Sequence, residues 1–428
     1  MDGRDCVRVK EFRKLRKEIR GSDEYLIVGI DVAKSKNNAF FGTSTGKTLL
    51  KRLVFENTFE GFDRLLTQTE SIRVQHDLQE VVFGLEPTAN YHKPLAEFLI
   101  KRCHNVVLVS GVAVKRNREL LDGRWDKHDA KDAANVADLI SQGKINFYEY
   151  ASVELRDLKG LLSLKRRLKK LEHGLRIRIR NHLLAQYFPE MDKFYGHGES
   201  ENLAIVRWCL SPDVISGLGY EKFFQMVTTR ANGISQENRL RAIWEQAPLS
   251  IGCDVTESVE FEAEVLVETL SRIREIIRSI DERIRKFGCR IPEFEYLLTI
   301  PGFGPDTSAK VIAALGNPFR FDNAKQVLKL AGFDLSANRS GETSYSATPV
   351  ISKKGKAHLR YALYQAAFIA SIKNKRFIAY YTNTIRGREG EKGIKTKMRV
   401  KLAAKMLVIA WTLMKKREPF NPDYLKID

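Results

Sequence analysis

Acidic residues stand at three points of the chain where a metal-dependent enzyme could use them. Asp31 and Glu86 each follow a short apolar run, and Asp129 and Asp132 stand three residues apart, a spacing that places two side chains on one helix face. Mg²⁺ prefers oxygen ligands, and two such ions about 3.5–4 Å apart can stabilise the attacking and leaving oxygens of phosphoryl transfer. The four carboxylates therefore predict a Mg²⁺ site, of two-metal type, that acts on a phosphodiester.

Each of these carboxylates also has an ordinary explanation. Asp31 alone suits a turn after a strand, Glu86 before a proline suits a solvated loop, and an acidic pair suits the start of a helix. Any one of them is more often structural than catalytic. Their order and placement together favour the catalytic interpretation, because converging carboxylates repel one another unless a cation lies between them.

A second group of candidate residues lies near the C-terminus. Ser340 stands beside Arg339, and Lys353, Lys354 and Arg360 follow. A serine hydroxyl is a weak nucleophile that needs a base, a metal or surrounding positive charge for activation. The pattern is compatible with a nucleophile in a cationic pocket, but Ser-Gly is also a common turn dipeptide. Taken alone, these residues favour a turn.

Two glycines suggest a phosphate contact. Gly302 and Gly304 lie in a Pro-Gly-Phe-Gly-Pro stretch that precedes an amphipathic run ending at Leu315. This is the outline of a helix-hairpin-helix motif, in which backbone amides at a helix start bind a phosphate. An ordinary turn before a helix is the default explanation for the glycine pair alone.

The charge of the chain indicates a polyanionic partner. The formal net charge is +19, and residues 351–428 hold 19 Lys and Arg against 5 Asp and Glu. Nucleic acid is the expected partner, and phosphate contacts are expected mainly in this C-terminal part. A solvated basic face is an equally good explanation for any single residue. The candidates are Arg386, Arg388, Lys395, Lys397 and Arg399.

Composition bounds the class of protein. With 428 residues, 43% hydrophobic and 29% charged, the chain is expected to fold into two or three domains. The sequence has no apolar run of membrane-spanning length and no signal peptide pattern, so no membrane partner is expected. Five scattered cysteines without a C-x-x-C pair suit a reducing cytoplasm and argue against a disulfide framework or structural zinc.

The pattern of apolar residues predicts an α/β domain at residues 25–150, after a basic extension at 1–24 that is compatible with a short helix. Strands are expected at 25–32, 38–43, 48–55, 81–85 and 106–110, and helices at 61–75, 93–101 and 129–142. The order βββαβαβα is that of an RNase H/RuvC-like domain. The fully apolar runs at 26–30, 81–85 and 106–109 are expected to be its buried parallel strands.

A helical region is expected at 151–292. Leucines 161, 164, 168, 171 and 175 form one seam at the heptad period, and a second seam runs from Leu266 to Phe287. An antiparallel hairpin within the chain and a coiled coil between subunits are equally compatible with this spacing. Residues 190–255 are expected to form a separate helical insertion, and residues 293–428 a C-terminal domain that carries Ser340.

Taken together, these motifs resemble the DEDD-type transposases of bacterial insertion sequences. That family combines an N-terminal RuvC-like domain with a C-terminal transposase domain that carries a serine, and it includes bridge-RNA-guided recombinases and pilin-gene invertases. Each motif alone is weak, whereas five in the same order are specific. They lie at residues 28–34, 84–88, 127–133, 301–304 and 340–360.

The resemblance implies a division of labour between the two ends of the chain. Asp31, Glu86, Asp129 and Asp132 would bind Mg²⁺, with no organic cofactor. Ser340 from a partner subunit of a dimer or tetramer would attack the DNA phosphodiester, and a strand hydroxyl would resolve the phosphoserine link. A structured noncoding RNA would pair with donor and target DNA, in the bacterial cytoplasm.

Two other functions compete with this interpretation. A hydrolytic, resolvase-like endonuclease would keep the carboxylates and use Ser340 only as a turn residue. A nucleic-acid scaffold without enzymatic activity would need neither group. The ordered set of carboxylates makes the scaffold the weaker alternative.

Overall fold

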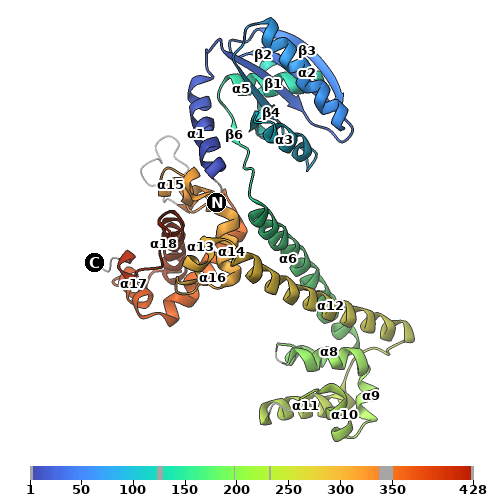
Figure 1. Cartoon of the computed structure of the whole chain (residues 1–428). Helices are drawn as coiled ribbons and strands as arrows, with labels where there is room; N and C mark the ends of the chain where they lie inside the picture. The colour runs from blue at the N-terminus through green and yellow to red at the C-terminus, as the bar shows by residue number, and fades with distance from the viewer. Residues whose placement is uncertain (1–2, 123–128, 197, 231–232, 337–349, 426–428) are drawn as a thin grey trace, which may run out of the picture. The chain divides into compact units, whose positions relative to one another are not determined.

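The chain folds into two compact units. The computed structural model (Figure 1) describes residues 3–122, 129–196, 198–230, 233–336 and 350–425. The first unit comprises Met1–Ser152 with Asn317–Asp322, and the second comprises Val153–Gly316 with Asn323–Asp428. Among the described residues, no helix combines the length and apolar character that a membrane crossing needs.

A six-stranded mixed sheet forms the centre of the first unit, with strand order β3-β2-β1-β4-β5-β6. β1 pairs in parallel with β4, and β4 pairs in parallel with β5, whereas β2, β3 and β6 pair antiparallel with their neighbours. The prediction of three parallel strands is confirmed. The strands are β1 (Tyr25–Asp31), β2 (Lys36–Thr43), β3 (Thr48–Glu56), β4 (Glu80–Leu85), β5 (Asn105–Leu108) and β6 (Asn146–Phe147).

Helices cover both faces of this sheet, which is why its central strands are apolar throughout. Leu26, Val28 and Ile30 of β1 pack into one core with residues of α2 and α3. Ile27, which points to the opposite face, packs into a second core with residues of α1, α4 and α5. The helices are α1 (Gly3–Glu18), α2 (Phe59–Gln75), α3 (His92–Lys101), α4 (Gly111–Asp122) and α5 (Asp129–Ser141).

A short helix in the basic extension agrees with expectation, whereas α4 was not expected. The basic segment 1–24 contains α1, and Leu15 and Ile19 from it are buried in the second core. α4 is an additional helix between β5 and α5. It buries Val114, but most of its residues after that point are charged or polar, so its apolar pattern is too sparse to predict it.

Two strand glycines let α5 lie directly on the sheet. A Cβ added at Gly29 of β1 would clash with the backbone of Ala133 and Ala137, and one added at Gly84 of β4 would clash with Ile140. Glycine is therefore required for this approach, and not for backbone conformation. The close packing places the first turn of α5 beside the carboxyl ends of β1 and β4.

In the second unit, α6 (Val153–Arg178) and α12 (Glu257–Gly288) pack against each other. Ion pairs join Lys165 to Asp281 at 2.6 Å and Arg274 to Glu172 at 3.3 Å, so the residue numbers run in opposite directions and the helices are antiparallel. Of the two arrangements left open by the heptad spacing, the helices adopt the hairpin within the chain.

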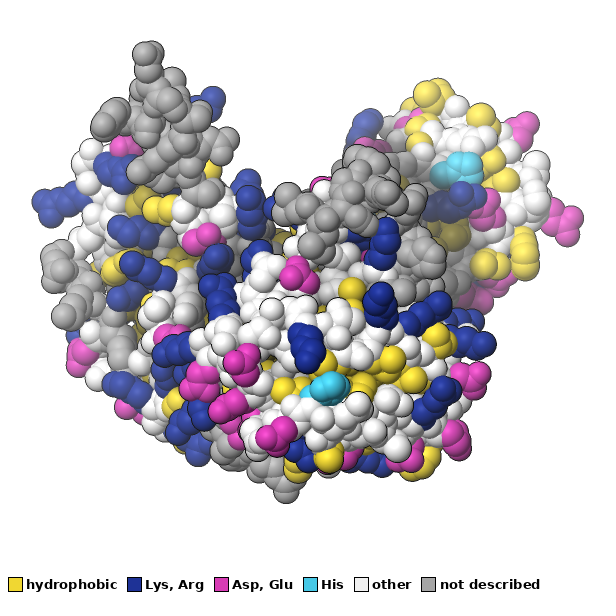
Figure 2. Space-filling model, turned by 90° about the horizontal axis from the view of Figure 1, so that it is seen from above, with side chains coloured by type: hydrophobic (Ala, Val, Ile, Leu, Met, Phe, Trp, Pro, Cys, Tyr) yellow, Lys and Arg dark blue, Asp and Glu magenta, His cyan; other side chains and the backbone are white. Residues whose placement is uncertain are grey.

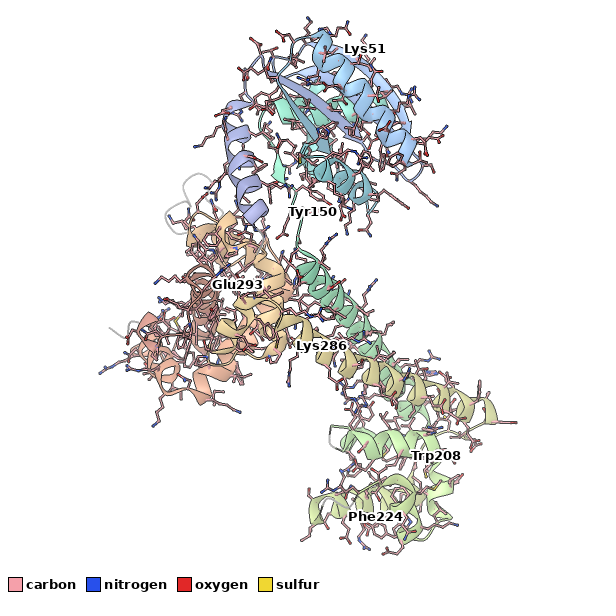
Figure 3. All side chains as sticks on the ribbon, viewed as in Figure 1. Lys51, Tyr150, Trp208, Phe224, Lys286 and Glu293 are labelled. Carbon is pink, nitrogen blue, oxygen red and sulfur yellow. The ribbon has the colours of Figure 1, made fainter. Side chains whose placement is uncertain are left out.

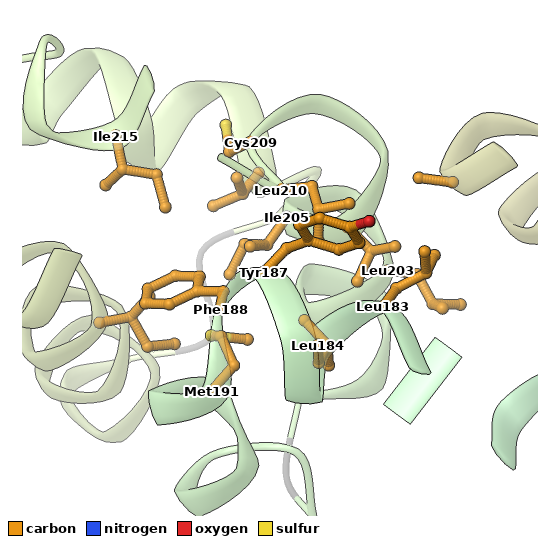
Figure 4. Close-up of a cluster of buried hydrophobic side chains, with 14 of the residues drawn as sticks. Leu183, Leu184, Tyr187, Phe188, Met191, Leu203, Ile205, Cys209, Leu210 and Ile215 are labelled. Carbon is orange, nitrogen blue, oxygen red and sulfur yellow. The ribbon is translucent and has the colours of Figure 1, made fainter. Parts of the chain in front are cut away.

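The segment between these two helices folds as a helical subdomain with its own core. Figure 4 shows part of this core, in which Leu183, Phe188 and Met191 meet Ile205 and Leu210. Figure 3 marks Trp208 and Phe224 in the same subdomain. Its elements are η1 (Ile179–Leu184), α7 (Ala185–Tyr187), η2 (Pro189–Lys193), α8 (Glu199–Trp208), α9 (Pro212–Ser216), α10 (Tyr220–Val227), α11 (Ile234–Gln246) and η3 (Ala247–Leu249).

The C-terminal helices gather around α18. Leu402, Met406, Leu407 and Leu413 of this helix are buried, because α13, α15, α16 and α17 all contact it. The elements are α13 (Pro292–Leu298), α14 (Pro305–Leu315), α15 (Ala324–Ala331), β7 (Leu335–Ser336), β8 (Val350–Ile351), α16 (Ala357–Lys373), α17 (Lys375–Ile385), α18 (Ile394–Lys416) and η6 (Pro422–Tyr424). The short helix η4 (Pro318–Arg320) belongs to the first unit.

Candidate active site

Asp31 and Glu86 come to neighbouring positions because their strands are parallel partners. Ile30 of β1 lies opposite Leu85 of β4, and each acidic residue is the next one along the chain. The backbone N–H of Glu86 donates to the Ile30 carbonyl oxygen at 3.4 Å, which extends the pairing by one residue. Both carboxylates are half-buried at the same edge of the sheet.

Asp132 joins them from α5. It lies in the first turn of that helix and is 3% exposed. The glycine contacts that bring α5 onto β1 and β4 are what place this carboxylate near the strand ends. Asp129 begins α5, but its side chain lies outside the part of the structure that is described.

The three described carboxylates line one pocket of about 500 Å³. Gly111 forms part of its wall, and a Cβ there would lie 2.7 Å from Glu86 Oε1, so glycine leaves the room that this carboxylate occupies. Positive side chains line the same pocket, namely Lys34, Lys115 and Arg118. Such a mixture can hold a cation and attract a phosphate.

Asp132 already has a cationic partner. Arg118 Nη2 of α4 donates to Asp132 Oδ1. One residue earlier, Asn117 Nδ2 donates to Asp138 Oδ2 of α5 at 2.7 Å, which fixes α4 against α5. Sequence reasoning missed Arg118, because its basic character is its only signal and the packing of α4 is what brings it to the pocket.

The donor chemistry of the pocket fits a hard divalent cation, since the candidate ligands are carboxylate oxygens. Within the described ranges, however, no three His, Cys, Asp or Glu side chains are close enough to hold a metal ion together. Three carboxylates thus share a pocket, and a complete ligand set would need them to move closer together or Asp129 to contribute.

A histidine follows Tyr91 of the pocket along the chain. His92, at the start of α3, is buried, and burial together with the neighbouring Lys93 lowers the pKa of its imidazole. Thr88 and Tyr91, just before it, line the carboxylate pocket.

Ser340 and Arg339, the central residues of the second group, lie outside the described residues. They belong to the segment that joins β7 to β8, two short strands that pair antiparallel. At the base of this pair, Ser352 Oγ donates to Asp334 Oδ1 at 2.6 Å.

Two other members of this group bond to the end of α15. Arg360 Nη1 donates to the Ala331 carbonyl oxygen at 2.8 Å, at the C-terminal end of α15. Lys353 has a left-handed backbone, with φ of 55°, and its N–H donates to the Gly332 carbonyl oxygen. Lys353 and Lys354 are exposed. Arg360 therefore has a structural task, and phosphate contact by these three residues stays a prediction.

One of the two glycines before α14 has a structural task. Gly302 has φ of 87°, and a Cβ there would clash with the Ala366 carbonyl oxygen of α16. Gly304 precedes the first residue of α14. Asp306, in the first turn of α14, pairs with Lys165 at 2.6 Å and with Lys310 at 2.5 Å, so a carboxylate occupies part of this helix start. A phosphate contact at the glycines stays a prediction.

The basic candidates of the C-terminal part lie around the turn between α17 and α18. Arg386, Arg388, Lys395 and Lys397 are exposed, although Arg388 pairs with Glu391 at 2.7 Å. Arg399 is half-buried and lies over the rings of Phe368 and Tyr381. Lys and Arg side chains are numerous on the face shown in Figure 2.

The first unit is a mixed sheet covered by helices, with an acidic pocket at the ends of its central strands. This is the architecture of an α/β nuclease-like domain, and a helical part follows it in the chain. Comparison with known proteins agrees. Residues 28–189 match a transposase family model of the IS110 DEDD type, and residues 294–382 match the transposase IS116/IS110/IS902 family.

Two relatives match most of the chain, and a third matches about a third of it. An uncharacterized 43.6 kDa protein of insertion element IS110 from Streptomyces coelicolor is 24% identical over 84% of this chain and 87% of its own length. A 44.8 kDa protein of insertion element IS116 from Streptomyces clavuligerus is 22% identical over 92% and 96%. The pilin gene-inverting protein of Moraxella lacunata is 26% identical over 34% of this chain and 45% of its own length.

The chain belongs to the DEDD-type transposases of bacterial insertion sequences. It is thus a transposase or recombinase, an enzyme that acts on DNA, and its family is typically metal-dependent.

Proposed function

We propose that this protein cuts and rejoins DNA through a RuvC-like, Mg²⁺-dependent acidic site and a serine nucleophile. Asp31, Glu86, Asp129 and Asp132 bind the metal, and Ser340 is the nucleophile. The observation that carries the proposal is that three carboxylates from three separate elements, β1, the end of β4 and α5, line one pocket. Carboxylates that share a pocket repel one another, and a bound cation relieves that repulsion.

The residues around the acidic site suit a DNA backbone. Mg²⁺ bound there would supply Lewis acid stabilisation of phosphate oxygens. Lys34 and Lys115 line the same pocket and attract the phosphodiester, while Glu86 and Asp132 supply the negative charge that holds the metal. The half-buried setting strengthens these interactions, since fewer water molecules screen them.

Ser340 carries the covalent step in this proposal. Its Oγ forms a bond to the phosphorus, the bond from phosphorus to one strand oxygen breaks, and that oxygen leaves with a proton as a hydroxyl. A strand hydroxyl then attacks the phosphoserine and releases the serine, so the energy of the phosphodiester bond is kept and not spent on hydrolysis. Ser340 comes from a partner subunit, and a structured noncoding RNA selects donor and target DNA by base pairing.

The test uses full-length protein with RNA transcribed from the element's flank and DNA carrying the element's ends. Wild-type protein is expected to recombine the DNA and to form a protein–DNA adduct that survives SDS. Ser340→Ala removes both products but leaves Mn²⁺ binding unchanged, whereas Glu86→Gln weakens Mn²⁺ binding. Ser344→Ala, at the next serine along the chain, keeps both products and serves as control.

Three results would redirect the proposal. Full recombination by Ser340→Ala would support a hydrolytic, resolvase-like endonuclease. Unchanged recombination by Glu86→Gln would remove the acidic site from the reaction. Recombination by protein stripped of RNA would show that DNA is selected without a guide.

A further inference from the structure

The contact between Arg118 and Asp132 sets a condition on how the acidic site is filled. The side chain of Asp132 is 5% exposed and that of Arg118 is 24% exposed. A buried carboxylate without a partner is costly, and the guanidinium, which stays charged at any ordinary pH, supplies that partner. The ion pair thus gives the buried side chain of Asp132 a partner in the protein without metal.

The position of Arg118 is determined by the packing of α4 on α5. Asn117 is buried, and its amide bonds to Asp138, which also accepts a hydrogen bond from Gln142 Nε2 at 2.8 Å. This network fixes α4 along α5 at a point between one and two turns beyond Asp132. The guanidinium is therefore held beside the carboxylate by the helix pair, and not by chance rotation of an exposed side chain.

The guanidinium is incompletely bonded in this position. Arg118 Nε is buried and has no hydrogen-bond partner in the described part of the chain. A buried donor without an acceptor is unfavourable, so an additional oxygen ligand in the pocket would improve the environment of Arg118. Both the carboxylate and the guanidinium line the pocket from which such an oxygen or a cation would come.

We propose that Arg118 is a positioning residue that competes with the divalent cation for Asp132. It holds the carboxylate in the metal-free protein and gives it up when the metal binds, which leaves its guanidinium able to bond a phosphate oxygen. This inference rests on the proposed function, because it takes Asp132 as a metal ligand. Arg118 therefore lowers the metal affinity and raises the stability of the metal-free protein.

Lys115 provides a matched control. It lies one turn before Arg118 on α4 and lines the same pocket with the same charge, and no ion pair between it and a carboxylate is seen among the described residues. Removing Lys115 changes the general electrostatic field at the site. Removing Arg118 changes that field and also removes the direct competitor.

The experiment measures Mn²⁺ binding to full-length protein by electron paramagnetic resonance, together with thermal unfolding with and without Mn²⁺. Arg118→Met is expected to bind Mn²⁺ about tenfold more tightly than Lys115→Met, because one competing equilibrium is removed. It should also unfold at a lower temperature without metal, and the deficit should shrink at saturating Mn²⁺. Arg118→Lys, which keeps the charge and protects folding, should lie between wild type and Arg118→Met in affinity.

The possible failures are distinguishable. Equal affinity in Arg118→Met and Lys115→Met, or weaker affinity in Arg118→Met, overturns the competition and leaves the acidic site standing. If Arg118→Met does not fold, an affinity of Arg118→Lys no higher than wild type overturns it instead. Absence of Mn²⁺ binding in wild type overturns the acidic site as well.

Discussion

Gly29→Ala tests whether close packing of α5 on the sheet builds the acidic site. The added methyl group would meet the Ala133 carbonyl oxygen and the Ala137 backbone nitrogen, so main chain, and not a flexible side chain, must move. Overpacking of this kind costs about 1–3 kcal/mol. A backbone clash places Gly29→Ala at the upper end of that range. Because α5 carries Asp132, its displacement should also weaken Mn²⁺ binding.

The same chemical change elsewhere should have the opposite sign. Gly174 lies within α6, and nothing lies within 4 Å of the Cβ that Gly174→Ala would add. Alanine is favoured over glycine in a helix interior by about 1 kcal/mol. Gly174→Ala should therefore stabilise the protein and leave Mn²⁺ affinity unchanged.

Denaturant unfolding and Mn²⁺ titration of the two variants provide the measurement. Amide hydrogen exchange adds a local readout, since α5 should lose protection in Gly29→Ala and keep it in Gly174→Ala. A Gly29→Ala protein as stable as wild type, with unchanged exchange in α5 and unchanged Mn²⁺ affinity, would refute the claim that α5 needs a strand glycine to position Asp132.

Three further predictions address other parts of the chain. Burial alone would raise the pKa of Asp306, but hydrogen bonds from Lys165 and Lys310 outweigh it and hold that pKa below its ordinary value of 3.8. The resulting stabilisation is present at neutral pH and is lost as the pH falls through 3.8 toward the pKa of the folded protein. Asp306→Asn should therefore make thermal stability fall less steeply with acid, and an unchanged acid slope would contradict the pairing. Replacing Arg386, Lys395 and Lys397 with Gln should reduce the slope of log affinity for duplex DNA against log salt by about 0.9 for each phosphate that the protein no longer neutralises. A protein with Lys193→Gln and Lys222→Gln in the helical subdomain is the control. If the triple variant has the same slope as this control, direct phosphate binding by the three replaced residues is excluded. Burial raises the pKa of the Cys209 thiol to about 11. Iodoacetamide at a mildly alkaline pH of about 8 should therefore modify exposed Cys103 and Cys253, and should reach Cys209 only after denaturation. Modification of Cys209 in the folded protein would contradict its burial.

The arrangement of the acidic residues could be predicted because it depends on strands that the sequence marks clearly. The runs before Asp31 and Glu86 are short and fully apolar, as expected for parallel strands buried on both faces. Once β1 and β4 are neighbours in parallel, the residues that follow them must lie side by side. The position of Asp132 depends in addition on the contact of α5 with Gly29 and Gly84. The spacing of the acids alone does not contain that contact.

The partner of Asp132 could not be predicted in this way. Arg118 belongs to a stretch in which Lys115, Arg116, Arg118 and Glu119 follow in close succession, so its pattern is that of a solvated surface. Val114 anchors the start of α4 in the core. Only the tertiary contact with α5, fixed by Asn117, turns one of several basic residues toward Asp132. Local sequence cannot single out that residue, because all of them have the same local preference.

The leucine seams show how a correct periodicity can still misplace side chains. In α12, Leu270, Ile273, Ile277, Ile280 and Ile284 are buried as the heptad spacing predicts, because α6, α8 and α14 all contact this helix. In α6, leucines 161, 168 and 175 are half-buried, whereas leucines 164 and 171 are exposed. The predicted seam of five leucines is therefore wrong in part. Residues seven apart lie along one line of a helix, so leucines 161, 168 and 175 form one line and leucines 164 and 171 form another. The neighbouring helices cover the first line more than the second. Heptad spacing states which residues can face a partner, but the number of neighbouring helices decides which of them do.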